Sequence, residues 1–175
     1  MKRTFIIALS ILVLLNLSAC NFERIVQLTG PQGGLVNPEL DKSASDSIAE
    51  LIINDLENKS VEALKDMFLQ AALDEIKNID VGIASVMKLF DGEVINFEGS
   101  VKMASKVLSK ESYIQKINAD YVIETSEARY KLEISFIAED SVNPENLGVY
   151  ALTLIRLEDS QSKEQVAIIG SRFSI

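Results

Sequence analysis

Residues 129–138 read RYKLEISFIA, and this stretch decides the fold class of the chain. Large apolar side chains occupy every second position, which is the period of a β-strand with one buried face and one face in water. The apolar set is Tyr130, Leu132, Ile134 and Phe136, and the polar set between them is Lys131, Glu133 and Ser135. The pattern predicts a strand that covers a hydrophobic core with one face.

Similar strand patterns lie on both sides of this stretch. Residues 112–125 are expected to pair with 129–138 as a hairpin that turns at 126–128. Residues 94–103 form an earlier candidate strand, in which Gly99 marks a bend or a bulge. After a polar loop at 140–148, residues 149–157 and 165–174 are the last two candidates, joined by 158–164. The sequence therefore predicts an antiparallel sheet of four to five strands.

The residues before position 93 have the period of helices instead. Apolar side chains recur at helical spacing in 48–56, with Ser45 as the expected N-cap, and in 60–72, with Ser60 as the cap. A third helix is expected to begin at Asp80 and to stop before Gly92. Helices followed by strands predict an α+β domain, with N-terminal helices packed on a curved antiparallel sheet.

The first twenty residues have the pattern of an export signal. Lys2 and Arg3 precede an apolar run over residues 5–15, which is shorter than the ~20 residues that a spanning helix needs. The run is followed by Leu17, Ser18, Ala19 and Cys20, the only cysteine of the chain. An uncleaved membrane anchor and cleavage by a general signal peptidase are the alternatives to a lipoprotein signal.

The sequence LSAC at 17–20 resembles the lipobox of bacterial lipoproteins. The resemblance implies that the Cys20 sulfur receives a diacylglyceryl group and that the chain is cut between Ala19 and Cys20. Two acyl chains hold a protein stably on a bilayer, so the expected location is the extracytoplasmic side of the cell membrane. In a Gram-negative host, Asn21 after the cysteine favours the outer membrane. The expected organisation is a signal peptide at 1–19, a lipidated cysteine and flexible tether at 20–42, and one domain at 43–175.

Four segments of the domain carry a second resemblance: NKSVEALKDMF, LFDGEV, ETSEARYKLEISF and NPENLGVYALTLI. They are similar to a family of uncharacterised Firmicutes lipoproteins built on the NTF2-like, or cystatin-like, fold. That fold implies a cavity between helices and sheet, and some members carry out isomerase or dehydratase chemistry in it. The side chains expected to line such a cavity are Phe68, Met87, Phe90, Tyr121, Tyr130 and Tyr150.

Composition excludes several kinds of chemistry. The chain has no histidine, so it cannot build a Ser-His-Asp triad, a Cys-His pair or the usual zinc sites. We expect no cofactor and no metal ion. Asp80, Asp91, Tyr121, Tyr130 and Tyr150 are the groups left for acid–base work, and each also has a structural explanation as a cap, a turn or a strand residue. The formal net charge of −9 makes a nucleic-acid partner unfavourable.

Three functions remain open from the sequence. The leading hypothesis is a membrane-tethered module that binds a small molecule, a peptide or a partner protein. A dehydratase-like or isomerase-like enzyme is the second hypothesis, and it requires a buried carboxylate near a tyrosine hydroxyl. The third is a structural or assembly role, with a homodimer formed through the sheet. We expect binding rather than catalysis, since the standard catalytic groups are missing.

Overall fold

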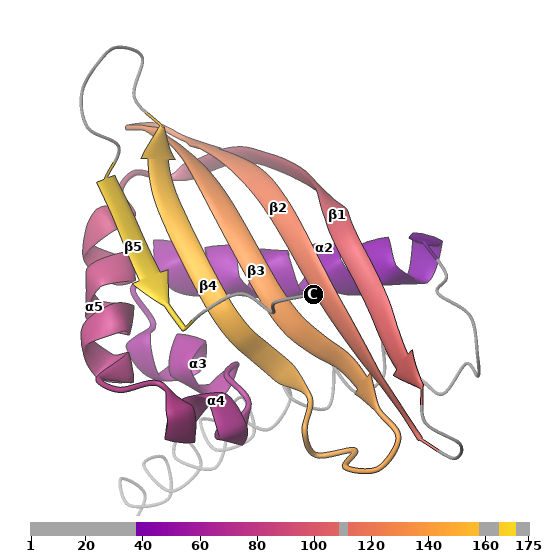
Figure 1. Cartoon of the computed structure of the whole chain (residues 1–175). Coiled ribbons are helices and arrows are strands. Elements are labelled where there is room, and N and C mark those ends of the chain that lie inside the picture. The colour runs from indigo at the N-terminus through magenta and orange to yellow at the C-terminus, as the bar shows by residue number, and fades with distance from the viewer. Residues whose placement is uncertain (1–37, 109–111, 158–164, 171–175) are drawn as a thin grey trace, which may run out of the picture.

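The computed structural model describes residues 38–108, 112–157 and 165–170, and it has the expected α+β order of helices followed by strands (Figure 1). Four helices come first: α2 (Pro38–Glu57), α3 (Val61–Asp66), α4 (Gln70–Glu75) and α5 (Ile79–Leu89). Five strands follow: β1 (Val94–Leu108), β2 (Tyr113–Thr125), β3 (Arg129–Asp140), β4 (Gly148–Leu157) and β5 (Gln165–Ile169). The strands pair in chain order as one antiparallel sheet, and the curved sheet carries α2 and α5 on one face.

The core lies between the helices and the face of the sheet that the helices cover. In residues 129–138, the four apolar side chains Tyr130, Leu132, Ile134 and Phe136 are fully buried. Lys131 and Glu133 are half-buried on the opposite face of the sheet. Helix α2 contributes Ile48, Ile52 and Leu56 from its inner side. The predicted strand, the hairpin at 126–128 and the polar loop before β4 are all confirmed, because alternation on a sheet is a local property.

Helix α2 begins earlier than expected. It starts at Pro38, so residues 38–42, which we assigned to the tether, are helical, and Ser45 is not its N-cap. Proline is favoured in a first helical turn because its fixed φ suits the helix and its missing N–H would have no partner there. Ser45 lies inside the helix, fully buried, with its hydroxyl 2.7 Å from the Tyr121 hydroxyl. The remaining tether residues and Cys20 lie outside the described part of the chain.

The single helix expected at 60–72 is two short helices. Met67, Phe68 and Leu69 are all buried, and three consecutive residues cannot all face the core from one side of a helix. They run instead beside the start of β4, where the Val149 N–H donates to the Met67 carbonyl (2.8 Å) and the Leu69 N–H donates to the Val149 carbonyl (3.0 Å). Long-range pairing thus ends α3 at Asp66.

Both ends of α5 differ from the expectation. The cap position is Asn78, in a left-handed conformation (φ 62°), while Asp80 lies in the first turn and pairs with Lys65 at 2.7 Å. The helix ends at Leu89 because the Lys59 ammonium donates to the carbonyls of Met87 and Phe90. Gly92 does have positive φ (86°), but it shapes the turn into β1 rather than the helix end.

Strand β1 continues to Leu108, past the expected end at 103, and its irregularities do not fall at Gly99. The register with β2 shifts between Val94 and Asn96 and again between Val101 and Met103. Gly99 itself pairs regularly with Tyr121. Its role is to leave room for the Tyr121 ring, which a periodicity argument does not reveal.

The Tyr121 hydroxyl ties α2 to the sheet, and its removal should weaken the domain. It lies 2.7 Å from the Ser45 hydroxyl and donates to Asp46 Oδ1 at 2.9 Å. Tyr121→Phe should lower the free energy of unfolding by about 1–2 kcal/mol, because Ser45 stays buried without its partner. Urea unfolding measures the loss. In the Ser45→Ala background the same substitution should cost clearly less, and equal costs in both backgrounds would contradict the pairing.

Candidate functional site

The side chains expected to line a cavity mostly belong to the packed core. Phe68, Met87, Phe90, Tyr121 and Tyr130 are each 8% exposed or less, and Phe90 stacks on Tyr130 with ring centroids 5.1 Å apart. Only Tyr150 of the six lines a described surface groove. The structure therefore brings five of them together as core and separates the sixth from them.

The hydroxyls of the two core tyrosines are engaged in structural hydrogen bonds. Tyr130 accepts from the Asp91 N–H at 2.9 Å and donates to the Leu89 carbonyl at 3.2 Å, which fastens the turn after α5. Burial raises the pKa of both Tyr121 and Tyr130 above the ordinary value. Each phenol thus stays protonated at neutral pH and acts as a neutral donor and acceptor.

The carboxylates expected near those hydroxyls are at the surface. Asp80 is 74% exposed in its pair with Lys65, and Asp91 is exposed, with one carboxylate oxygen accepting from the Gly92 N–H. Asp46, which bonds Tyr121, is 42% exposed and also pairs with Lys42. Among the described residues, the buried carboxylates are instead Asp41 and Asp55 on α2 and Asp140 on β3, and burial raises the pKa of Asp55 to about 6.

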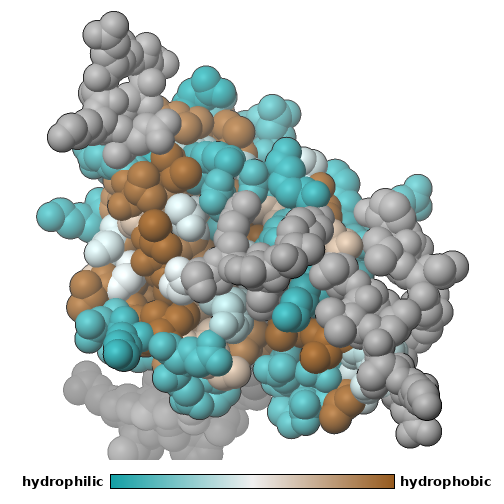
Figure 2. Space-filling view, viewed as in Figure 1, coloured by the Kyte–Doolittle hydropathy of each residue, from teal (hydrophilic) through white to brown (hydrophobic). Residues whose placement is uncertain are grey.

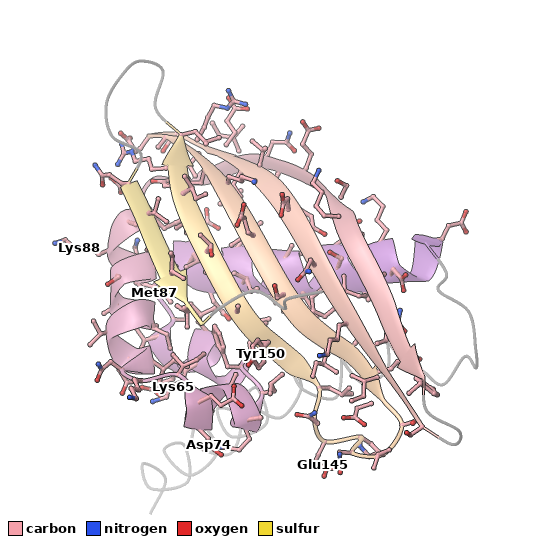
Figure 3. The ribbon with its side chains drawn as sticks, viewed as in Figure 1. Lys65, Asp74, Met87, Lys88, Glu145 and Tyr150 are labelled. Carbon is pink, nitrogen blue, oxygen red and sulfur yellow. The ribbon has the colours of Figure 1, made fainter. Side chains whose placement is uncertain are left out.

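The groove that contains Tyr150 is the candidate site. It has a volume of about 540 Å³ and lies between the α4–α5 connection, the first turns of α5, and β5. Tyr150 reaches it from β4 and sits between α4 and the end of β5 (Figure 3). Its hydroxyl donates to Glu75 Oε2 at 2.6 Å, and this bond is the main reason that the pKa of Tyr150 is raised. The two residues form the polar end of the groove.

A β-bulge directs Tyr150 into this position. Ser135 on β3 faces Ala151, and the next residue, Phe136, faces Val149, so Tyr150 is the extra residue of β4. A bulge re-aims a side chain and is over-represented next to functional sites. Here it turns a tyrosine from the regular sheet pattern toward α4.

Polar side chains, Lys77, Asn78 and Ser85, also line the groove, and beside them lie apolar side chains that are unusually exposed. Val81 on α5 is 65% exposed, and Val166 and Ile168 on β5 are 48% and 58% exposed. Figure 2 shows apolar surface gathered over α5 and β5 at this edge of the molecule. The sequence of β5 could have indicated this exposed apolar surface. In QVAII at 165–169, both faces of an edge strand are apolar, although one face of such a strand is usually in contact with water.

Two residues in left-handed conformations border the groove, Asn78 (φ 62°) and Gly170 (φ 74°). Such conformations cost free energy in a non-glycine residue and collect at functional sites. The outer edge of β5 is itself covered by α5, since a Cβ on Gly82 would lie 3.3 Å from the Ile168 carbonyl oxygen. This close approach protects the edge from pairing with another strand and leaves the side chains as the available surface.

Two further observations concern the described residues as a whole. None of their helices combines the length and the apolar character that crossing a membrane requires. Among them there is also no group of three or more cysteine, aspartate or glutamate side chains placed to hold a metal ion.

The chain was compared with known proteins. A family model described as "Domain of unknown function (DUF5104)" matches residues 51–157, which is more than half of the chain. The match covers the C-terminal end of α2 from Leu51, the other helices, and the strands β1 to β4. It includes Tyr150 and Glu75 but not β5. No curated protein matches the chain.

Proposed function

Because the chain belongs to the DUF5104 family, whose function is unknown, we propose its role from the site: a lipid-anchored extracytoplasmic protein that binds a ligand in the Tyr150 groove. Location and binding rest on different residues. Location rests on the resemblance of LSAC at 17–20 to a lipobox, and binding rests on the exposed apolar surface beside Tyr150 and Glu75.

The groove chemistry favours an elongated ligand that carries both apolar and polar groups, because Lys77, Asn78 and Ser85 line the groove beside its apolar side chains. Val81, Val166 and Ile168 offer apolar contact along its length. Glu75 accepts one hydrogen bond from Tyr150 and, as a carboxylate, accepts further ones. An amine, a guanidinium or an amide N–H of the ligand would complete this end. The ligand is therefore a small molecule, a peptide or a segment of a partner protein that carries such a donor.

The anchor is tested at the cysteine. In a bacterium that processes lipoproteins, Cys20→Ala should abolish incorporation of labelled fatty acid and leave the precursor uncut, because the sulfur that accepts the lipid is gone. Gel mobility and radiolabel measure both effects. Cys20→Ala protein that is processed and released normally would refute the anchor. Ser18→Ala, which keeps a small residue two positions before the cysteine, is the matched control and should be lipidated normally.

The groove is tested with Nile red, a neutral apolar dye, as the probe. Ile168→Ser should weaken dye binding about fivefold, since it removes roughly 1 kcal/mol of apolar contact. Ile95→Ser is the matched control, because Ile95 is 67% exposed on β1, away from the groove. Fluorescence titration measures both variants. Equal loss in the two variants, or no loss in Ile168→Ser, would contradict a binding surface at this groove.

A further inference from the structure

The outer edge of β1 has no partner strand within the described part of the chain. β1 stands first in the strand order of the sheet, so only β2 pairs with it. The opposite edge, on β5, is covered by α5 where Gly82 approaches the Ile168 carbonyl. An edge strand presents N–H and C=O groups on which another extended chain can pair. The two edges of the sheet thus differ, and β1 is the open one.

Hydrogen bonds at the hairpin determine which backbone groups of β1 point outward. The Thr125 N–H donates to the Ala128 carbonyl at 2.9 Å, so every second residue of β2 counted back from Thr125, including Tyr121, is hydrogen-bonded to β3. These residues direct no backbone N–H or C=O at β1. The β1 residues opposite them therefore turn their own N–H and C=O groups away from the sheet, and they are Phe97, Gly99 and Val101.

Only a short part of this edge is regular. The register with β2 shifts between Val94 and Asn96 and again between Val101 and Met103, which leaves a regular stretch at 96–101. Irregularities of this kind interrupt pairing at sheet edges. The stretch, NFEGSV, contains no proline, and its one charged side chain lies on the face opposite to that of the core residues. The edge therefore accepts a short strand and resists pairing along its whole length.

Helix α2 forms a shelf beside this edge. It crosses behind the sheet, and its first turns extend beyond β1 (Figure 1). A groove of about 600 Å³ lies there, lined by Phe97 of β1 and by six side chains of α2: Glu39, Lys42, Ser43, Asp46, Ser47 and Glu50. Three of the six are acidic and one is basic, so the shelf carries net negative charge. A strand added to β1 would place every second side chain over this shelf.

The shelf offers a carboxylate that is not yet neutralised. Lys42 pairs with Asp46 at 2.6 Å, and Asp46 also accepts from the Tyr121 hydroxyl. Glu50 is exposed, and within the described residues its carboxylate has no hydrogen bond or ion pair. Phe97 is half-buried in the same groove and provides apolar contact for the alkyl stem of a lysine or an arginine. The groove is thus suited to basic side chains.

We propose that the 96–101 edge of β1 binds a basic, extended segment of a partner protein as an added antiparallel strand, with alternate lysine or arginine side chains over α2. A second copy of the chain is less suitable. Its β1 would bring Phe97, Gly99 and Val101 over the shelf and no cation, and its α2 would bring the same negative charge. This site is separate from the Tyr150 groove, so the inference goes beyond the proposed function.

Fluorescence anisotropy tests the proposal with the full-length chain in mild detergent. The probe is the fluorescein-labelled peptide Thr-Lys-Thr-Lys-Thr-Lys-Thr, and its charge control has glutamate in place of each lysine. In the proposed pairing the lysine N–H groups donate to β1 and the threonine N–H groups point to solvent, because directly opposed residues of antiparallel strands share a face. Two further peptides are therefore N-methylated, one at the lysines and the other at the threonines.

The lysine peptide should bind about tenfold more tightly than the glutamate peptide, because the charges over the shelf are then complementary. N-methylation at the lysines should abolish binding, whereas N-methylation at the threonines should preserve it. Glu50→Lys should weaken binding of the lysine peptide about fivefold, since it replaces an attraction with a repulsion. Glu62→Lys is the matched control, because Glu62 is exposed on α3, outside the groove, and the change in net charge is the same.

Three results would overturn the proposal. If the peptide methylated at the lysines binds as well as the one methylated at the threonines, the attraction is one of charge without strand pairing. Equal effects of Glu50→Lys and Glu62→Lys would place the peptide elsewhere on the acidic surface. The third is no binding of the lysine peptide. In that case, a dimer in sedimentation that Val101→Pro dissociates would assign the edge to a second copy, because the proline removes an N–H that points outward.

Discussion

Replacing Gly99 with alanine should lower the free energy of unfolding by about 3 kcal/mol, the upper range for an overpacked core. A Cβ on Gly99 would lie 2.3 Å from Tyr121 Cδ1 and 2.4 Å from the Asp120 carbonyl oxygen. The ring cannot move aside, because its hydroxyl is held by Ser45 and Asp46. The carbonyl belongs to the β2 backbone, so relief requires β1 to shift.

Urea unfolding of Gly99→Ala against Ser100→Ala isolates this effect. Ser100 is the next residue of β1, is exposed, and should tolerate alanine within ~0.5 kcal/mol. In a Tyr121→Ala background the Gly99→Ala cost should shrink, since the obstructing ring is gone and only the carbonyl contact remains. If Gly99→Ala unfolds at the same urea concentration as Ser100→Ala, the close approach of β1 to Tyr121 is wrong.

Asp55→Asn should stabilise the protein at pH 7.5 by about 2–3 kcal/mol and have little effect near pH 4. Asp55 is 7% exposed, and burial raises its pKa from 3.8 to about 6. The folded state therefore holds this proton more tightly than the unfolded state does. Stability from Asp55 is fully present below pH ~4 and is lost as the pH rises through about 6, whereas asparagine never ionises.

The measurement is the free energy of unfolding in urea at pH 4.5, 6 and 7.5 for wild type and variant. Asp66→Asn is the matched control, because Asp66 is exposed at the end of α3 and the substitution removes the same charge. A difference between Asp55→Asn and wild type that is the same at all three pH values would show that Asp55 ionises in the fold as freely as in water.

Prediction from sequence succeeded where the signal was local. Alternation in 129–138 predicted β3, and the same reasoning predicted its hairpin partner and the order of helices before strands. It failed where a distant residue decides. The sequence predicted Phe68 in a helix, but in the structure it pairs with Val149 of β4. The sequence predicted Ser45 as an N-cap, but it lies inside α2 with its hydroxyl beside that of Tyr121.

The candidate site could also be predicted from the sequence only where its features are local. Tyr150 was named from the sequence as a cavity residue, but its partner Glu75 lies 75 positions away and the bulge that aims it depends on β3. The other five expected cavity residues are core, because apolar side chains at helical and strand spacing pack together unless something holds them apart. Of the apolar part of the groove, only the outer face of QVAII at 165–169 could be predicted from the sequence.

The sequence by itself determined the α+β class, the strand at 129–138 and the absence of histidine chemistry, because periodicity and composition need no partner. The anchor at Cys20 stays a prediction from the resemblance to a lipobox. Tertiary structure decided where the helices start and stop, which tyrosine lines a groove, and that Asp55 is buried. It also decided that a groove forms between α5 and β5. These features depend on groups that are far apart in the chain and close in space, and the energies of their contacts exceed the local preferences that sequence patterns express.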